Sequence, residues 1–159
     1  MHAILLLAFL ALIGCARTES YQVVIQSGDF TREQEGQIVQ AMEAWESAVP
    51  VTFRVHIDGC PDPLWNTVCV RSVPTIAEPS GAKAYGRTDM HDELDYSSFV
   101  NIAADTPPDL FVKVVTHEMG HAQGLVHHGA GTLMYATTNT DQAAAPTEDD
   151  IQQWETYRR

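Results

Sequence analysis

The pattern of hydrophobic and polar residues predicts strands that alternate with helices along most of the chain. Short runs rich in β-branched and aromatic residues, some of them alternating with polar residues, are typical of strands. These predicted strands lie at residues 21–26, 51–57, 68–73, 82–88 and 98–103. Between the first two, apolar residues recur at helical spacing from Ile38 to Trp45. Strands and helices that alternate in this way indicate a single α/β domain.

End signals delimit the first and the last predicted helix. Thr31, followed by Gln34 three residues later, forms a capping box, which predicts a helix start at this point. Pro50 stops that helix, so we expect its end near residue 48. Thr147 precedes an acidic turn at residues 148–150, where negative charge favours a helix N-terminus.

A third helix is predicted between these two, and it carries the chemistry discussed below. Thr106 is expected to be its N-cap, with Pro107 at the first helical position and Asp109 at the third. Gly124 is expected to end the helix, because glycine readily adopts the left-handed conformation of a C-terminal cap.

Composition and charge exclude some classes of protein. The chain has 159 residues and a formal net charge of −12, with 45% hydrophobic residues. This hydrophobic content is typical of a folded protein and not of a disordered one. The excess of acidic residues disfavours nucleic acid as a partner, because phosphate binding needs clustered Lys and Arg.

The N-terminus has the pattern of an export signal. Residues 3–13 form an apolar run of 11 residues, whereas a membrane span needs about 20. The run therefore indicates a signal peptide. The following Leu-Ile-Gly-Cys at residues 12–15 resembles the lipobox of bacterial lipoproteins; the alternative is an ordinary secretory signal with an incidental cysteine.

The lipobox resemblance implies a specific location. Residues 1–14 would be removed, Cys15 would be lipidated, and residues 15–20 would tether the domain at 21–159 to a membrane of the bacterial envelope. Ala16 after the cysteine resembles the pattern sorted to the outer membrane. If the lipobox is not used, we expect secretion.

The other two cysteines bracket a short loop that contains proline. In an exported protein, Cys60 and Cys69 at this spacing favour a disulfide. The alternative is that Cys60-Pro61-Asp62 resembles the inhibitory cysteine switch of secreted metalloproteases. The switch lies before the catalytic domain, however, whereas Cys60 follows the first predicted helix.

The helix that precedes Gly124 contains the sequence HEMGH. His117 and His121 are separated by four residues, which places both imidazoles on one face of the helix. That geometry suits two ligands of a tetrahedral zinc ion. Glu118 lies beside them and is free to act on a zinc-bound water instead of binding metal.

The motif continues past the helix as HExxHxxGxxH. Gly124 allows the chain to leave the helix sharply, which brings His127 back as a third ligand. Met134 follows seven residues later, in a Leu-Met-Tyr sequence that resembles the Met-turn beneath the zinc ligands of metzincins.

These motifs resemble those of the metzincins, and specifically of matrixin-like zinc endopeptidases. The resemblance extends over residues 21–157, with its specific part at 117–135. It implies a twisted mixed sheet of four to five strands with an active-site helix and a C-terminal helix. It also implies one catalytic Zn²⁺, Glu118 as general base, and a peptide or protein substrate that lies along the strand at 82–88. We expect a monomer.

Some alternatives stay open. A structural zinc site would usually be closed by a fourth protein ligand such as cysteine, and none lies near in the sequence. The main alternative function is a noncatalytic zinc-containing lipoprotein that binds peptides; another is an enzyme for very small peptides or cell-wall crosslinks. The acidic cluster of Asp89, Asp92, Glu93 and Asp95 is compatible with a Ca²⁺ site or with a solvated turn.

Overall fold

The computed structural model describes residues 18–61, 67–77, 83–91, 97–137 and 142–158. The predicted signal peptide and Cys15 lie outside these residues. The strands are β1 (Glu19–Gln26), β2 (Val51–Asp58), β3 (Thr67–Val73), β4 (Ile76–Ala77), β5 (Lys83–Ala84), β6 (Gly86–His91) and β7 (Ser97–Ala103). The helices are α1 (Arg32–Ala48), α3 (Pro108–Ala122) and α4 (Glu148–Tyr157).

A five-stranded mixed sheet is the centre of the fold, as the sequence predicts. Its strand order is β2-β1-β3-β7-β6, with β6 antiparallel to β7 and the other neighbours parallel. The parallel pair β1 and β2 is joined by α1, which is the usual way to return the chain for a parallel neighbour. In this strand order, β2 and β6 are the two edge strands. β4 and β5 form a separate two-stranded sheet.

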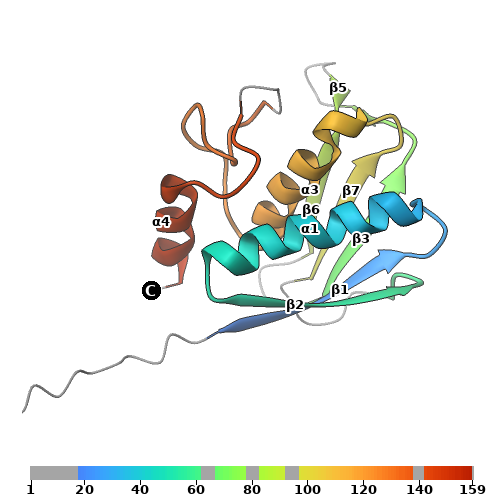
Figure 1. Cartoon of the computed structure of the whole chain (residues 1–159), viewed down its shortest axis with the longest axis horizontal. Coiled ribbons are helices and arrows are strands. Elements are labelled where there is room, and N and C mark those ends of the chain that lie inside the picture. Colours follow the sequence, from blue (N-terminus) through green and yellow to red (C-terminus); the bar gives the residue numbers. More distant parts are fainter. Residues whose placement is uncertain (1–17, 62–66, 78–82, 92–96, 138–141, 159) are drawn as a thin grey trace, which may run out of the picture.

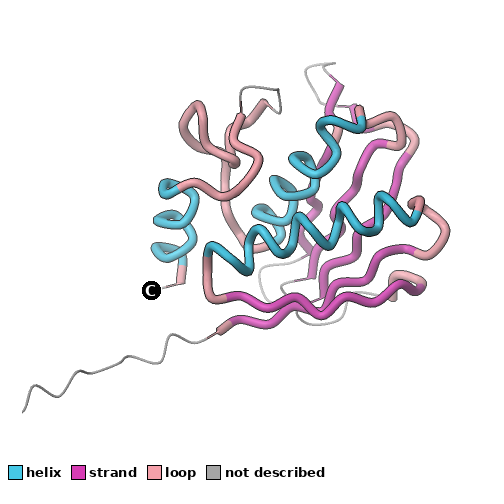
Figure 2. Tube along the Cα trace, viewed as in Figure 1, coloured by secondary structure: helices cyan, strands magenta, loops and turns pink. Residues whose placement is uncertain are grey.

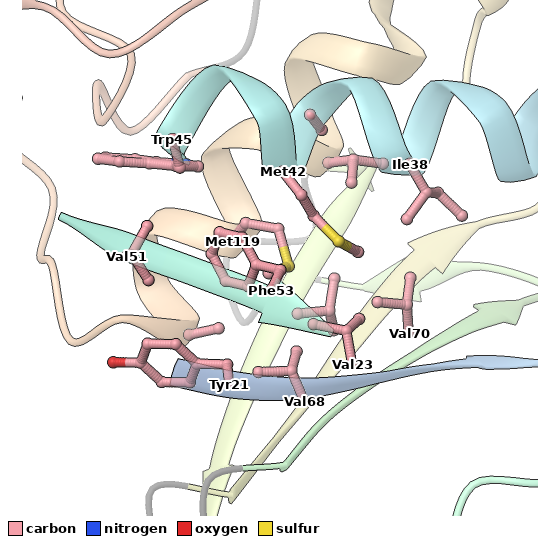
Figure 3. Packing of buried hydrophobic residues seen from close by; sticks show 14 of the residues in the cluster. Tyr21, Val23, Ile38, Met42, Trp45, Val51, Phe53, Val68, Val70 and Met119 are labelled. Atoms are coloured by element: carbon pink, nitrogen blue, oxygen red, sulfur yellow. The ribbon is translucent and has the colours of Figure 1, made fainter. Parts of the chain in front are cut away.

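Helices α1 and α3 cover one face of this sheet, and α4 lies to its side beyond long loops (Figures 1 and 2). The core between helices and sheet consists of aliphatic, aromatic and methionine side chains (Figure 3), among them Val23, Ile25, Ile38, Met42, Trp45, Val68, Val70, Val115 and Met119. The Trp45 indole Nε1 donates a hydrogen bond to the Thr116 carbonyl oxygen over 2.8 Å. This bond links α1 to the helix that carries the motif.

The capping predictions for the outer two helices are confirmed. Thr31 and Gln34 make both bonds of a capping box at the start of α1. Thr147 caps α4 and makes the equivalent pair with Asp150. Both boxes satisfy backbone N–H groups that a helix start otherwise leaves unpaired.

The predicted N-cap of the middle helix is wrong by one residue. Pro107 is the N-cap and Pro108 takes the first helical position. The Thr106 hydroxyl instead donates to the Ala103 carbonyl oxygen over 2.7 Å, so it stabilises the end of β7 and is not available to cap α3. The helix ends at Ala122, slightly before the predicted end.

The predicted strand at 82–88 is in fact two strands. Lys83 and Ala84 pair with β4, whereas the chain from Gly86 onward pairs with β7. The change of partner falls at Tyr85, whose carbonyl oxygen accepts a hydrogen bond from the Ala103 amide over 2.8 Å. The local sequence pattern is continuous across residues 82–88, but the two parts of this segment pair with different distant strands, which the local pattern does not indicate.

Candidate metal centre and active site

Helix α3 presents two imidazoles on one face, as the spacing of four residues requires. The Nε2 atoms of His117 and His121 are 3.1 Å apart. His117 is buried and His121 half-buried, so the two rings lie at the boundary between the core and solvent. Glu118, between them in sequence, is also buried.

The end of α3 brings the third histidine back. Gly124 has φ +88°, a conformation that other residues rarely adopt. The Gly124 amide bonds the His121 carbonyl over 2.8 Å, and the Leu125 amide bonds the Gly120 carbonyl over 3.1 Å, which is the pattern of a Schellman cap. After this turn, His127 Nε2 lies 3.2 Å from His117 Nε2 and 3.0 Å from His121 Nε2.

Backbone carbonyls fix the tautomers of the two helical histidines. His117 Nδ1 lies 2.7 Å from the Leu133 oxygen, and His121 Nδ1 lies 2.8 Å from the Leu125 oxygen. Because a carbonyl only accepts, each Nδ1 carries the proton and each Nε2 directs its lone pair toward the other ligands. Burial lowers the pKa of His117 to about 4 and also lowers the pKa of His121, which favours the neutral form that binds metal.

Three Nε2 atoms that converge in this way are the arrangement expected around a shared cation. The spacings of 3.0–3.2 Å fit three corners of a zinc tetrahedron, because Zn–N bonds of about 2.0–2.1 Å place the nitrogens roughly 3.3 Å apart. Among the residues that the structure describes, these three histidines are the only such group. Three protein ligands leave one coordination position for water or substrate, as in catalytic sites.

The Ca²⁺ alternative receives no support from the structure. Asp92, Glu93 and Asp95 lie outside the described residues. Asp89 is half-buried, and its carboxylate forms an ion pair with Arg87 at 2.9 Å.

The Met134 side chain is fully buried. A β-carbon placed on Gly120 would lie 2.4 Å from Met134 Sδ and 2.9 Å from Trp45 Cζ2. The bare backbone of α3 at Gly120 thus lets the Met134 side chain pack directly against the helix. The preceding Leu133 supplies the carbonyl that orients His117, so this turn supports one ligand through a hydrogen bond and the helix through packing.

A buried carboxylate from α4 holds this turn in place. Asp150 is 0% exposed, and its two oxygens accept the backbone N–H groups of Leu133 and Met134, each over 3.1 Å. His128 Nε2 lies 3.0 Å from Asp150 Oδ1. The His128 ring is therefore directed at Asp150 and is not one of the three converging histidines.

The sequence did not indicate three residues that contact the site. Asp150 reads as the third residue of a capped helix, and that local role hides its contact with the turn. Thr88, whose hydroxyl lies 2.7 Å from Glu118 Oε2, had a signal only as part of an expected edge strand. Gln142 is buried and donates to the Leu133 carbonyl, and nothing in its neighbourhood of the sequence indicates this.

The predicted disulfide is present. Cys60 and Cys69 are bonded, with their Cα atoms 5.7 Å apart, a separation typical of disulfides. The bond joins the segment after β2 to β3. Because the Cys60 sulfur is already bonded, the structure does not support the cysteine-switch alternative.

The fold and the site together define a metzincin-type zinc protease: a mixed sheet, an HExxH helix, a third histidine after a glycine turn, and a buried methionine packed against that helix. Residues 75–157 match the family model of the matrixins. The chain belongs to the matrixin family of metallopeptidases.

Two solved archaeal structures share the fold. Archaemetzincin from Methanopyrus kandleri aligns with a TM-score of 0.61 at 13% identity, covering 93% of this chain and 100% of that one. Archaemetzincin from Archaeoglobus fulgidus, crystallised with malonate, aligns with a TM-score of 0.57 at 11% identity, covering 83% and 99%. A comparison with curated proteins finds no match.

Proposed function

We propose that this protein is a zinc-dependent endopeptidase in which His117, His121 and His127 hold the metal and Glu118 is the general base. The observation that carries the proposal is the triangle of three Nε2 atoms, 3.0–3.2 Å apart, two of them on the helix that also presents the buried carboxylate of Glu118. Hydrolysis needs a carboxylate next to the metal ligands, whereas a site that only stores metal or supports the fold does not need one.

The chemistry follows from these residues. Zinc, when bound, supplies Lewis acidity that polarises a peptide carbonyl and lowers the pKa of a water molecule. Glu118 accepts one proton from that water as its oxygen adds to the carbonyl carbon, and then gives the proton to the leaving amine nitrogen. The C–N bond breaks, and the water is divided between the new carboxyl and amine groups. The carboxylate of Glu118 ends as it began.

The edge strand β6 is the proposed substrate-binding strand. Among the described strands it pairs with β7 alone, so its other edge offers backbone N–H and C=O groups to an extended peptide. The Thr88 hydroxyl of this strand lies 2.7 Å from Glu118 Oε2. A peptide added to β6 would therefore run past the general base, which favours internal peptide bonds as the point of cleavage.

A fluorogenic peptide library, assayed with and without a chelator, tests this function. Wild-type protein should cleave part of the library, and chelator should abolish the cleavage. Glu118→Gln should keep one zinc per chain, measured by atomic spectroscopy, and lose cleavage by roughly 10²–10⁴-fold, the usual contribution of general acid–base catalysis. Glu43→Gln, which changes an exposed carboxylate on α1, is the matched control and should cleave like wild type.

The noncatalytic peptide-binding alternative gives a different result in the same experiment. A binder would hold library peptides in a zinc-dependent way without cleaving any of them. Equal cleavage by wild type and Glu118→Gln would refute the role of Glu118 while leaving the protease itself in place.

We also propose that the protein is exported and anchored through a lipid on Cys15. The support for this is the resemblance of residues 12–15 to a lipobox. As a separate finding, no helix within the described part of the chain has the length and hydropathy to cross a membrane. Metabolic labelling with a tritiated fatty acid in a bacterial host should mark wild type and not Cys15→Ser. Labelling of both proteins would contradict the anchor at this residue, and labelling of neither would favour secretion without it.

A further inference from the structure

The side chain of Glu118 lies directly against the edge strand β6. Its Oε2 atom is 2.7 Å from the Thr88 hydroxyl oxygen. A β-carbon built on Gly86, two residues earlier, would lie 2.6 Å from Glu118 Oε1 and 2.7 Å from Glu118 Cγ. Residues two apart in a strand share one face, so Gly86 and Thr88 together form the wall against which this carboxylate rests.

The two contacts act differently on the carboxylate. Because Gly86 has no side chain, the Glu118 carboxylate can occupy the space beside it. Any larger residue at position 86 would displace the carboxylate. The Thr88 hydroxyl has a single proton to donate; it lies nearer to Glu118 Oε2 than to the Glu118 backbone oxygen, which is 3.0 Å away. Hydrogen bonds to a charged acceptor are the stronger ones, so the hydroxyl proton is directed to the carboxylate.

We infer that Thr88 is a positioning residue for the general base: its hydroxyl fixes the rotation of the Glu118 carboxylate relative to the metal ligands. This inference rests on the proposed function. It also means that one strand does two things, because the strand proposed to pair with the substrate also orients the group that takes the proton. The substrate backbone and the general base are thus both positioned by the same strand, β6.

The position of Thr88 supports this role over a purely structural one. Thr88 is half-buried, so water could serve as the hydrogen-bond partner of its hydroxyl. The hydroxyl therefore does not need Glu118 merely to have a hydrogen-bond partner. The strand itself is held by its pairing with β7 along its described length, from Gly86–Ile102 to His91–Ser97. Fixing β6 in the sheet therefore does not depend on the Thr88 hydroxyl.

Three variants test the inference by steady-state kinetics on the best peptide of the library. Thr88→Val removes the hydroxyl and keeps the shape, and it should lower kcat by roughly 10- to 100-fold, as expected for loss of a hydrogen bond to a charged group. Its KM should stay near the wild-type value, and its zinc content should stay at one per chain. Thr88→Ser restores a hydroxyl and should recover most of kcat.

Thr116→Val is the matched control. Thr116 lies in α3, fully buried, and its hydroxyl donates to the Val112 carbonyl oxygen over 2.7 Å. Like Thr88→Val, this variant removes a threonine hydroxyl that makes a hydrogen bond of 2.7 Å. The Thr116 hydroxyl is two residues before Glu118 in the sequence, but its hydrogen bond goes to the backbone and not to the carboxylate. It should keep a kcat close to wild type.

The outcomes separate the inference from the proposed function. A kcat of Thr88→Val equal to that of Thr116→Val, or a Thr88→Ser variant no better than Thr88→Val, overturns the positioning role. Wild-type protein that cleaves no peptide overturns the proposed function instead. Wild-type protein that cleaves no better than Glu118→Gln overturns the role of Glu118 as general base, and with it the positioning role of Thr88, but not the protease activity. Loss of zinc from Thr88→Val alone would assign the residue to the fold of the site and would also overturn the inference.

Discussion

Replacement of Gly120 by alanine tests whether the buried methionine packs on the active-site helix as the structure shows. The new β-carbon would lie 2.4 Å from Met134 Sδ and 2.9 Å from Trp45 Cζ2. Both side chains are 0% exposed, so neither can move into solvent to relieve the contact. Overpacking of this kind costs about 1–3 kcal/mol of stability.

Helix propensity opposes this loss and must be measured separately. Alanine is favoured over glycine within a helix by about 0.8–1.0 kcal/mol. Gly36 in α1 supplies the reference, because it is exposed and a β-carbon there would meet nothing within 4 Å. Gly36→Ala should thus raise the free energy of unfolding by roughly that propensity difference, whereas Gly120→Ala should change it by about 0 to −2 kcal/mol.

Urea unfolding of metal-free protein measures both values, with the slope of the transition as a check on two-state behaviour. The difference between the two variants, about 1–3 kcal/mol, isolates the crowding at Gly120. Introduced into a Met134→Ala background, Gly120→Ala should cost less than it does in wild type, because the crowded sulfur is absent there; the single Met134→Ala variant is the reference for this comparison. If Gly120→Ala stabilises the protein as much as Gly36→Ala does, the packing of Met134 on the helix is refuted.

Three further predictions concern other parts of the molecule. Replacing both Cys60 and Cys69 by serine should lower the free energy of unfolding by about 2–3 kcal/mol; denaturation without reductant measures this, and an unchanged midpoint would contradict it. Asp150→Asn leaves one backbone N–H of the turn facing an amide donor and should cost about 1–3 kcal/mol; a variant as stable as wild type would show that the carboxylate does not hold the turn. Burial raises the pKa of Tyr21 from 10.0 to about 12, so the stability it contributes below pH 10 should be lost as pH rises from 10 toward 12. Tyr21→Phe should remove this alkaline slope in unfolding curves, and a slope that persists would assign it to other groups.

Local chemistry explains how much of the fold could be predicted. Neighbouring residues alone determine the pattern of a strand and the capping box of a helix. For this reason α1, α4 and the strands β1, β2, β3 and β7 lie where the sequence predicts them. The two errors have a common cause. Thr106 bonds Ala103 and not its own helix, and the chain changes sheets at Tyr85, because contacts with other segments override the local preference.

The same division applies to the site. The ligands lie within eleven residues of one another, so the spacing of His117, His121 and His127 together with one glycine turn already predicts their convergence. The supporting groups come from elsewhere: Thr88 is 30 residues before Glu118, and Asp150 is 16 residues after Met134. The sheet order and the packing of α4 bring them together, and neither follows from spacing.

This division has a functional consequence. A motif that a sequence reveals supplies the candidate ligands and the proposed base, but the orientation of each depends on residues that the fold brings from elsewhere in the chain. The Leu133 carbonyl orients His117, and Asp150 holds the Leu133 amide; the Glu118 carboxylate rests on β6, which is held by its pairing with β7. Damage to either distant support should therefore lower activity while every residue of the motif is intact, and the two supports should fail differently. Loss at Asp150 acts through a ligand and should weaken zinc binding, whereas loss at Thr88 acts through the base and should lower kcat with zinc still bound.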